Sequence, residues 1–206
     1  MSMRVTAKCR YNAAVRLQHQ GKFAFFTTTV LSLGLIFIPL MQNAGVALAY
    51  KPNVLNMMQI FLAVAVLVYS VVIGTARYEY RAENLTECGD KLKELIRILD
   101  KDREIKGTFS SDDLAKMQER YSDIATDTEN HTRSDYRLAM LEMDNDYFIS
   151  GLPRLSEYLF AYADRITAYV VPVLMISFEV VFITDMIGIT NVLPPYFNGT
   201  SIPVNN

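Results

Sequence analysis

Two long apolar runs near the N-terminus dominate the pattern of hydrophobic and polar positions along the chain. Residues 23–41 contain no charged side chain, and residues 54–76 contain none either. The hydrocarbon core of a bilayer is about 30 Å thick, so a spanning helix needs roughly 20 apolar residues, and both runs meet this requirement. The joint between the runs contains Gly45 and Pro52, which favour turns and end helices. The pattern therefore predicts a transmembrane helical hairpin over residues 23–76.

Two buried helices of a large soluble core are the alternative interpretation of this hairpin. A chain of 206 residues has little other sequence with which to wrap two such helices, which favours the membrane. Backbone groups in lipid must be paired within one segment or within a closed barrel, and both runs are long enough to pair as helices.

A third apolar run, residues 167–189, carries Glu179 near its middle and Asp185 near its far end. Nothing after Asp185 is charged, and residues 190–206 are rich in Pro and Asn, so we expect them to form an exposed tail. Hydropathy and charge bias predict a third membrane span with the C-terminus outside. Because two acids interrupt the run, a re-entrant or interfacial helix is the alternative.

Basic residues are concentrated before the first run. Residues 1–22 contain no acid and carry Arg4, Lys8, Arg10, Arg16 and Lys22. We interpret this segment as an amphipathic helix near the inner leaflet, where each basic side chain gains about 1 kcal/mol from anionic headgroups. The positive-inside rule then places the N-terminus in the cytoplasm, the joint outside, and the return to the cytoplasm at Arg77.

Beyond residue 76 the composition changes abruptly from apolar to charged, which predicts a cytoplasmic helical domain over residues 77–166. We expect the second span to continue straight into the first helix of this domain. A heptad-like seam on that helix suits an oligomer contact, and intrachain packing against later helices is the alternative. The seam consists of Leu85, Cys88, Leu92, Leu95 and Leu99.

Further helices are predicted in the same domain. One begins after Ser110, which forms a pattern similar to a capping box with Asp113, and another covers residues 134–147. A last amphipathic helix is predicted from the stripe Leu152, Leu155, Leu159, Tyr162 and Ile166. Because β alternation is absent from the sequence, the predicted fold class is an all-α membrane protein.

Small and polar side chains within the spans are candidates for helix contacts or for a pore lining. Faces of small residues let helices approach closely in lipid. A carboxylate near the bilayer centre costs roughly 3 kcal/mol, so Glu179 is expected to face a bundle interior or a watery cavity. In the alternative interpretation, a neutral Glu179 hydrogen-bonds to Thr28, Ser32 or Gln59 on a neighbouring helix. The candidates are Thr28, Ser32, Gln59, Ser70, Gly74, Glu179 and Asp185.

One polar cluster of the cytoplasmic domain is suggestive, namely Asn130, His131, Asp135 and Tyr136. On a helix, His131 and Asp135 would share a face and could form a hydrogen-bonded acid/base pair. No nucleophile or oxyanion device accompanies the pair, which favours a helix-terminal network capped by Asn130. We therefore expect no enzymatic activity.

Metal, cofactor and nucleic-acid functions find no support in the sequence. The chain has only two histidines and no glycine-rich phosphate motif, which excludes a His-rich metal site within one chain. Cys9 and Cys88 lack C-x-x-C spacing and fall on the predicted cytoplasmic side, so we expect reduced thiols that serve in packing. We expect no cofactor, no metal and no direct nucleic-acid binding.

The order of several short motifs is similar to that of the SLATT superfamily, the SMODS and SLOG-associating two-transmembrane effectors of prokaryotic conflict and anti-phage systems. The resemblance covers residues 5–140. Its motifs are the hairpin, the charged helix behind it, and the residues Arg10, Tyr11, Arg16, Leu17, Tyr121, Asn130, His131, Asp135 and Tyr136. The apolar C-terminal run departs from a two-span pattern and suits the branch of the superfamily associated with reverse transcriptases.

The resemblance implies a homo-oligomeric effector in the prokaryotic inner membrane. Such an effector forms a pore or disrupts the membrane when an upstream sensor signals infection, which causes abortive infection. The implied upstream partners are a nucleotide-signal synthetase, a SLOG-type protein or a reverse transcriptase. The alternative is a non-conducting membrane anchor or scaffold that recruits a soluble partner through the helical domain.

The basic N-terminal segment and the uncharged tail predict that the N-terminus is inside and the C-terminus outside. An impermeant label applied to intact spheroplasts should therefore modify a reactive group placed in residues 190–206. A tail that is protected from the label would rule out the third span.

Overall fold

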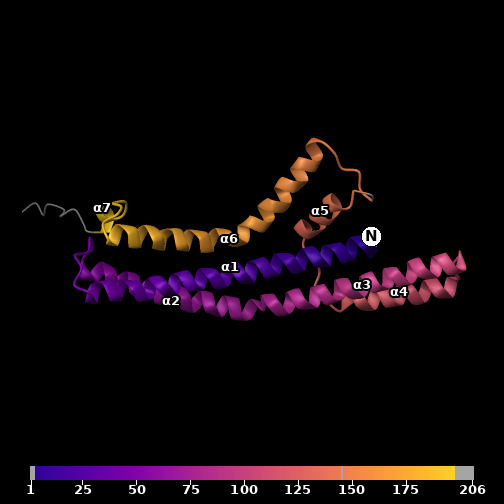
Figure 1. Cartoon of the computed structure of the whole chain (residues 1–206), viewed down its shortest axis with the longest axis horizontal. Helices are drawn as coiled ribbons and strands as arrows, with labels where there is room; N and C mark the ends of the chain where they lie inside the picture. The colour runs from indigo at the N-terminus through magenta and orange to yellow at the C-terminus, as the bar shows by residue number, and fades with distance from the viewer. Residues whose placement is uncertain (1–2, 145, 198–206) are drawn as a thin grey trace, which may run out of the picture. The chain divides into compact units, whose positions relative to one another are not determined.

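The computed structural model describes residues 3–144 and 146–197, and the described residues form α-helices joined by turns, without a β-strand (Figure 1). The helices are α1 (Met3–Asn43), α2 (Pro52–Ala76), α3 (Tyr78–Lys106), α4 (Ser111–Thr126), α5 (Arg133–Glu142), α6 (Leu152–Met186) and α7 (Pro194–Phe197). Three helical stretches, which contain α1, α2 and α6, are long and apolar enough to cross a membrane. The predicted all-α membrane fold is confirmed.

The chain divides into two compact units. The helical unit contains the N-terminal residues up to Gly21 together with Arg77–Ala168. The membrane unit contains Lys22–Ala76 together with the residues from Tyr169 onward. Of the predicted tail, residues 190–197 form a turn and α7, and residues 198–206 lie outside the described part of the chain.

Helix α1 is a single continuous helix through the junction of the two units, where a separate amphipathic helix was expected. Gly21 allows a close helix contact within the helical unit, because a Cβ at this position would lie 3.1 Å from Cβ of Tyr78. The N-terminal part of α1 buries Val5, Cys9 and Leu17 in the helical unit. Packing within the helical unit therefore accounts for the apolar side chains of this segment.

The expected continuous helix from the second span into α3 is interrupted at one residue. Arg77 lies between α2 and α3 with φ 46° and ψ 45°, the left-handed conformation. A residue in this conformation interrupts the helical hydrogen-bond ladder. The ladder begins again where the Arg81 N–H donates to the Arg77 carbonyl at 3.0 Å.

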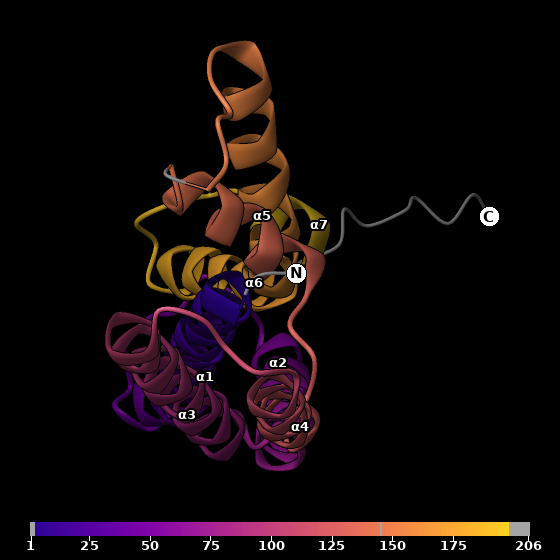
Figure 2. The same ribbon diagram turned by 90° about the vertical axis from the view of Figure 1, so that its right-hand side faces the viewer.

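The leucine seam of α3 is buried within one chain. Leu85 packs with Ala13, Ala14 and Leu17 of α1, while Leu92 packs with Ala7 of α1 and with side chains of α4. Leu95 is buried and Leu99 is half-buried. Figure 2 shows α3 and α4 next to each other. The intrachain alternative therefore describes Leu85 and Leu92, and it leaves little of the seam for a contact between copies.

Local capping sets the limits of α4 and α5. The Ser110 hydroxyl accepts hydrogen bonds from the backbone N–H groups of Asp112 and Asp113 at 3.2 and 3.3 Å, so α4 begins where the sequence predicts. Helix α5 begins with a capping box formed by Thr132 and Asp135. It ends at Glu142, before the predicted limit of 147, and Arg154 donates to the Leu141 carbonyl at 3.1 Å.

The apolar stripe predicted at the start of α6 is exposed, contrary to the expected burial of an amphipathic face. Its five side chains, Leu152, Leu155, Leu159, Tyr162 and Ile166, are each more than half exposed. Helix α6 instead uses a different face in the helical unit, on which Ala161 is fully buried against Leu138 and Leu141 of α5.

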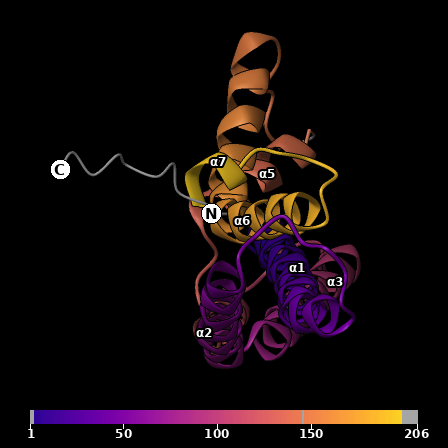
Figure 3. The same ribbon diagram turned by 90° about the vertical axis from the view of Figure 1, so that its left-hand side faces the viewer.

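The core of the membrane unit lies among α1, α2 and α6 (Figure 3). Leu31 and Ile38 of α1 pack in one cluster with Leu55 of α2 and with Phe182 and Met186 of α6. The buried positions of α1 in this unit recur every three or four residues, about one helical turn, namely Ala24, Thr27, Leu31, Gly34 and Ile38. This stripe makes α1 the central helix of the unit.

The burial of Leu92 predicts a large difference between two leucine substitutions in the helical unit. Leu92 is 0% exposed and Leu114 of α4 is 52% exposed. Leu92→Ala should lower the free energy of unfolding by about 3 kcal/mol through the cavity it leaves, whereas Leu114→Ala should change it little. Thermal unfolding of the detergent-solubilised chain by circular dichroism measures both variants. Equal melting temperatures would contradict the intrachain packing of the seam.

Candidate functional site

Glu179 is the most unusual side chain of the membrane unit. It lies on α6, is only 1% exposed, and has no hydrogen-bond partner for either carboxyl oxygen among the described residues. Its carboxyl group fits against Gly34 of α1, where a Cβ would lie 1.8 Å from Oε1. A side chain at position 34 would therefore displace the carboxyl group. The contact between α1 and α6 forms a notch that accepts this one group.

An apolar groove opens from this notch. It has a volume of about 460 Å³ and is lined by Val30, Leu33, Gly34, Ile36, Phe37 and Leu40 of α1 and by Glu179, Val180 and Ile183 of α6. Glu179 is the only ionisable residue among these lining residues. The groove therefore combines one polar group with a hydrocarbon wall.

The polar residues expected to partner Glu179 bond elsewhere. The Thr28 hydroxyl donates to the Ala24 carbonyl of its own helix at 3.0 Å. Gln59 donates through Nε2 to Oε1 of Gln42 at 2.5 Å, which links α2 to α1. Ser32 borders a separate groove of α1 with Thr28, and it does not hydrogen-bond to the Glu179 carboxyl group. Thr28, Ser32 and Gln59 therefore do not donate the hydrogen bond to Glu179 that the alternative interpretation expected.

The small residues Ser70 and Gly74 of α2 are exposed within the chain. The Ser70 hydroxyl donates to the Val66 carbonyl of its own helix at 2.7 Å. A Cβ at Gly74 would meet nothing within 4 Å. The structure does not bring these two residues together with Glu179.

Asp185, the second acid of α6, is fully satisfied. Its carboxylate accepts hydrogen bonds from the Thr190 hydroxyl at 2.5 Å and from the N–H groups of Val192 and Leu193 at 3.0 and 2.7 Å. The Tyr50 hydroxyl also donates to it at 3.3 Å. Asp185 thus fixes the turn after α6 and ties it to the joint before α2, which is a structural role.

A buried ionic network organises the helical unit. Asp135 of α5 is 0% exposed and accepts hydrogen bonds from Arg16 of α1 at 3.1 Å and from Arg165 of α6 at 3.2 Å. The Thr132 hydroxyl donates to the same carboxylate at 2.7 Å. Burial tends to raise the pKa of Asp135, but the hydrogen bonds from Arg16 and Thr132 hold it below its ordinary value.

The predicted pair of His131 and Asp135 does not form. His131 precedes α5, and its buried Nδ1 has no hydrogen-bond partner among the described residues, because arginines and Thr132 take up the Asp135 carboxylate. The His131 ring lies 6.4 Å from the Tyr136 ring. Thr132 is the N-cap of α5, so Asn130, which is exposed, does not cap it as expected.

Sequence reasoning missed the arginines of the helical unit as partners. Arg10 is 2% exposed and donates to the backbone carbonyls of Ala125, at 3.0 Å, and Glu129, so it holds the end of α4. Arg16 and Arg165 reach Asp135 from two other helices. For Arg10 and Arg16 the sequence signal was a run of basic residues without acids over residues 1–22, a pattern that also suits a membrane surface.

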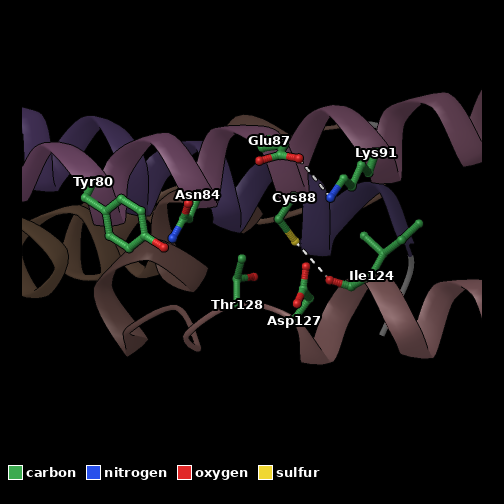
Figure 4. Close-up of a pocket in the computed structure, with 8 residues that line it drawn as sticks. All are labelled: Tyr80, Asn84, Glu87, Cys88, Lys91, Ile124, Asp127 and Thr128. Atoms are coloured by element: carbon green, nitrogen blue, oxygen red, sulfur yellow. Dashed lines mark hydrogen bonds and ion pairs between the residues drawn. The ribbon is translucent and has the colours of Figure 1, made fainter.

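A small polar pocket lies between α3 and the end of α4 (Figure 4). Its volume is about 170 Å³, and it is lined by Tyr80, Asn84, Glu87, Cys88, Lys91, Ile124, Asp127 and Thr128. Glu87 and Lys91 form an ion pair at 2.9 Å, and the Cys88 thiol donates to the Ile124 carbonyl at 3.4 Å. Among the described residues, no group of three His, Cys, Asp or Glu side chains is placed to hold a metal ion.

Comparison with known proteins identifies a family. The model of the SMODS and SLOG-associating 2TM effector domain family 5 matches residues 1–183. The match extends well past the expected limit of residue 140 and includes most of α6, so the third apolar helix lies largely within the matched region. No curated protein and no solved structure matches the chain.

The environment of His131 predicts a pH-dependent stability. Burial lowers the pKa of His131, and the nearby Arg10 charge lowers it further. A depressed folded-state pKa contributes stability that is present above the ordinary value of 6.5 and is lost as the pH falls below it. The melting temperature should therefore drop between pH 7.5 and pH 5, and His131→Gln should remove this part of the drop. Asp135 contributes in the same direction only below its ordinary value of 3.8.

The matched control is the other histidine, His19, which is exposed. His19→Gln should retain the full drop in melting temperature of the parent chain over the same pH range. If the two variants behave alike, the pH dependence does not arise from the burial of His131.

Proposed function

Because the chain belongs to the SMODS and SLOG-associating 2TM effector domain family 5, we propose that it is an oligomeric membrane effector of a prokaryotic anti-phage system. On an upstream signal it forms a pore or disrupts the inner membrane, which halts the infected cell. The observation that carries the proposal is the buried, unpartnered carboxyl group of Glu179 within a helix that is long and apolar enough to span a membrane.

A carboxyl group in the middle of a span is costly unless it faces water or a partner. Insertion scales put the cost at roughly 3 kcal/mol, and such residues usually line a bundle interior or an aqueous cavity. Within one chain Glu179 is buried between α1 and α6, but its carboxyl group has no hydrogen-bond partner among the described residues. In the proposed open assembly, Glu179 from several copies leaves its notch, faces a water-filled lumen and ionises, and the resulting ring of carboxylates favours cations.

Contacts between copies have suitable surfaces in the membrane unit. Ser70 and Gly74 lie on an exposed face of α2 at four-residue spacing. Faces of small residues let helices pack closely in lipid, where there is no hydrophobic drive between helices. The leucine seam of α3 is already used within the chain, so the exposed face of α2 replaces it as the proposed contact between copies.

The helical unit receives the signal in this proposal. The N-terminus lies in the cytoplasm, as the basic residues before the first span favour. The upstream partner is a nucleotide-signal synthetase, a SLOG-type protein or a reverse transcriptase, of which the first two follow the description of the family. The proposal assigns neither a catalytic reaction nor a cofactor to the chain.

A non-conducting scaffold is the second candidate function, and one observation favours it. The stripe Leu152, Leu155, Leu159, Tyr162 and Ile166 exposes an apolar face of α6 in the helical unit. Exposed apolar faces of this kind serve as protein contacts. A scaffold would use this face to recruit a soluble partner and would leave the membrane impermeable.

A substitution at Glu179 separates conduction from scaffolding. Glu179→Gln keeps the shape of the side chain and removes its charge, so it should assemble normally but abolish the cation preference of the pore. Glu179→Asp keeps the charge and is the matched control, which should retain the preference. Depolarisation of bacterial cells after induced overexpression, together with ion selectivity in liposomes, measures both variants.

Two outcomes would contradict this account of Glu179. If Glu179→Gln selects cations as the parent chain does, the pore is lined by other residues. If the parent chain assembles but neither depolarises cells nor conducts in liposomes, the scaffold is the correct function.

A further inference from the structure

The carboxyl group of Glu179 lacks a hydrogen-bond donor among the described residues. Each carboxyl oxygen is an acceptor, and a buried acceptor without a partner costs about 1–3 kcal/mol. The nearby hydroxyl groups of α1 donate within their own helix, as Thr27 does to Phe23 at 2.9 Å and Thr28 does to Ala24 at 3.0 Å. A donor from outside the chain would therefore stabilise this group.

The groove beside Glu179 has the features of a small-molecule site. Its volume of about 460 Å³ falls within the range typical of ligand pockets. Its wall is made of Val, Leu, Ile and Phe side chains, and Glu179 is its one ionisable lining residue, with both carboxyl oxygens covered in the notch. Gly34 is what admits this polar group, since any larger residue would fill the notch.

The position of the groove determines the chemistry of its ligand. Leu33, Ile36 and Leu40 line the groove and are also well exposed on the outer face of α1, so access is from the hydrocarbon phase. A charged ligand would have to lose its hydration to reach this depth, which is strongly unfavourable. The chemistry that fits is a neutral molecule with an apolar body and a single hydrogen-bond donor.

We propose that the groove between α1 and α6 binds a neutral membrane amphiphile, such as a long-chain alcohol, whose hydroxyl group donates a hydrogen bond to the Glu179 carboxyl group once that group turns from its notch toward the groove. The site belongs to the resting chain and does not require conduction. Binding supplies the missing hydrogen bond to the carboxyl group and fills the groove between α1 and α6.

An apolar carbodiimide tests access to the site. The O–H of a neutral carboxyl group adds across a C=N bond of dicyclohexylcarbodiimide to give an O-acylisourea, and transfer of the acyl group from oxygen to nitrogen gives a stable N-acylurea. No group leaves, so the protein gains the whole mass of the reagent. Mass spectrometry of the full chain reconstituted in vesicles should locate this adduct at Glu179, and Glu179→Gln should abolish it.

Protection by 1-hexadecanol tests the ligand itself. At ten times its dissociation constant, the alcohol should slow the labelling of Glu179 about tenfold, in proportion to the fraction of free sites. In Gly34→Ala the displaced carboxyl group should still be labelled, but the alcohol should no longer protect it. Val64→Ala on α2 is the control, because this side chain is 54% exposed and does not line the groove, and it should keep both labelling and protection.

Three outcomes would overturn the proposal. Failure of the alcohol to protect the parent chain would leave water or a neighbouring helix as the occupant of the groove. Labelling by a water-soluble carbodiimide from the aqueous phase would show a hydrated cavity instead of a lipid-facing site. Where Gly34→Ala does not fold, the decisive measurement is the melting temperature, which the alcohol should raise in the parent chain and not in Glu179→Gln. An equal rise in both would also overturn it.

Discussion

The membrane unit depends on how it accommodates a carboxyl group that apolar surroundings disfavour. Desolvation of such a group is costly without a hydrogen bond, so its neutral form is the one that a dry site stabilises. The structure accommodates Glu179 by steric means, in a notch that exists because residue 34 is glycine. Asp185, six residues further along α6, shows the opposite solution, because two backbone N–H groups and two hydroxyl groups donate hydrogen bonds to its carboxylate. Asp185 is therefore held by hydrogen bonds, whereas the Glu179 carboxyl group has no partner among the described residues.

The helical unit is organised around a different acid. Asp135 is fully buried, and the positive charges of Arg16 and Arg165 reach it from α1 and α6. Removal of one member of a buried ionic group is strongly destabilising, because the remaining charges lose their compensation. Three helices that are distant in the sequence are thus held together by one carboxylate. Helices α1 and α6, which carry Arg16 and Arg165, both continue into the membrane unit.

Features that depend on length and local composition could be predicted from the sequence, and features that depend on partner choice could not. The spans follow from uncharged runs, and the start of α4 follows from Ser110, because both signals lie within a few residues. Glu179 was visible as an acid in an apolar run, but its notch at Gly34 lies on a helix far away in the sequence. The left-handed backbone at Arg77 has no sequence signal, since it is not a glycine. The expected pair of His131 and Asp135 does not form, because Arg16, Arg165 and Thr132 donate hydrogen bonds to the carboxylate.

The most direct test of the state of Glu179 is the infrared spectrum of the resting chain reconstituted in lipid vesicles at neutral pH. The difference between the spectra of the parent chain and Glu179→Gln isolates the bands of this one carboxyl group. The account predicts a carbonyl stretching band of a protonated carboxylic acid in an apolar environment, shifted to lower frequency when a hydroxyl-bearing amphiphile is added. A difference spectrum that contains only carboxylate bands would show that Glu179 is ionised and hydrated at rest, and would contradict the account.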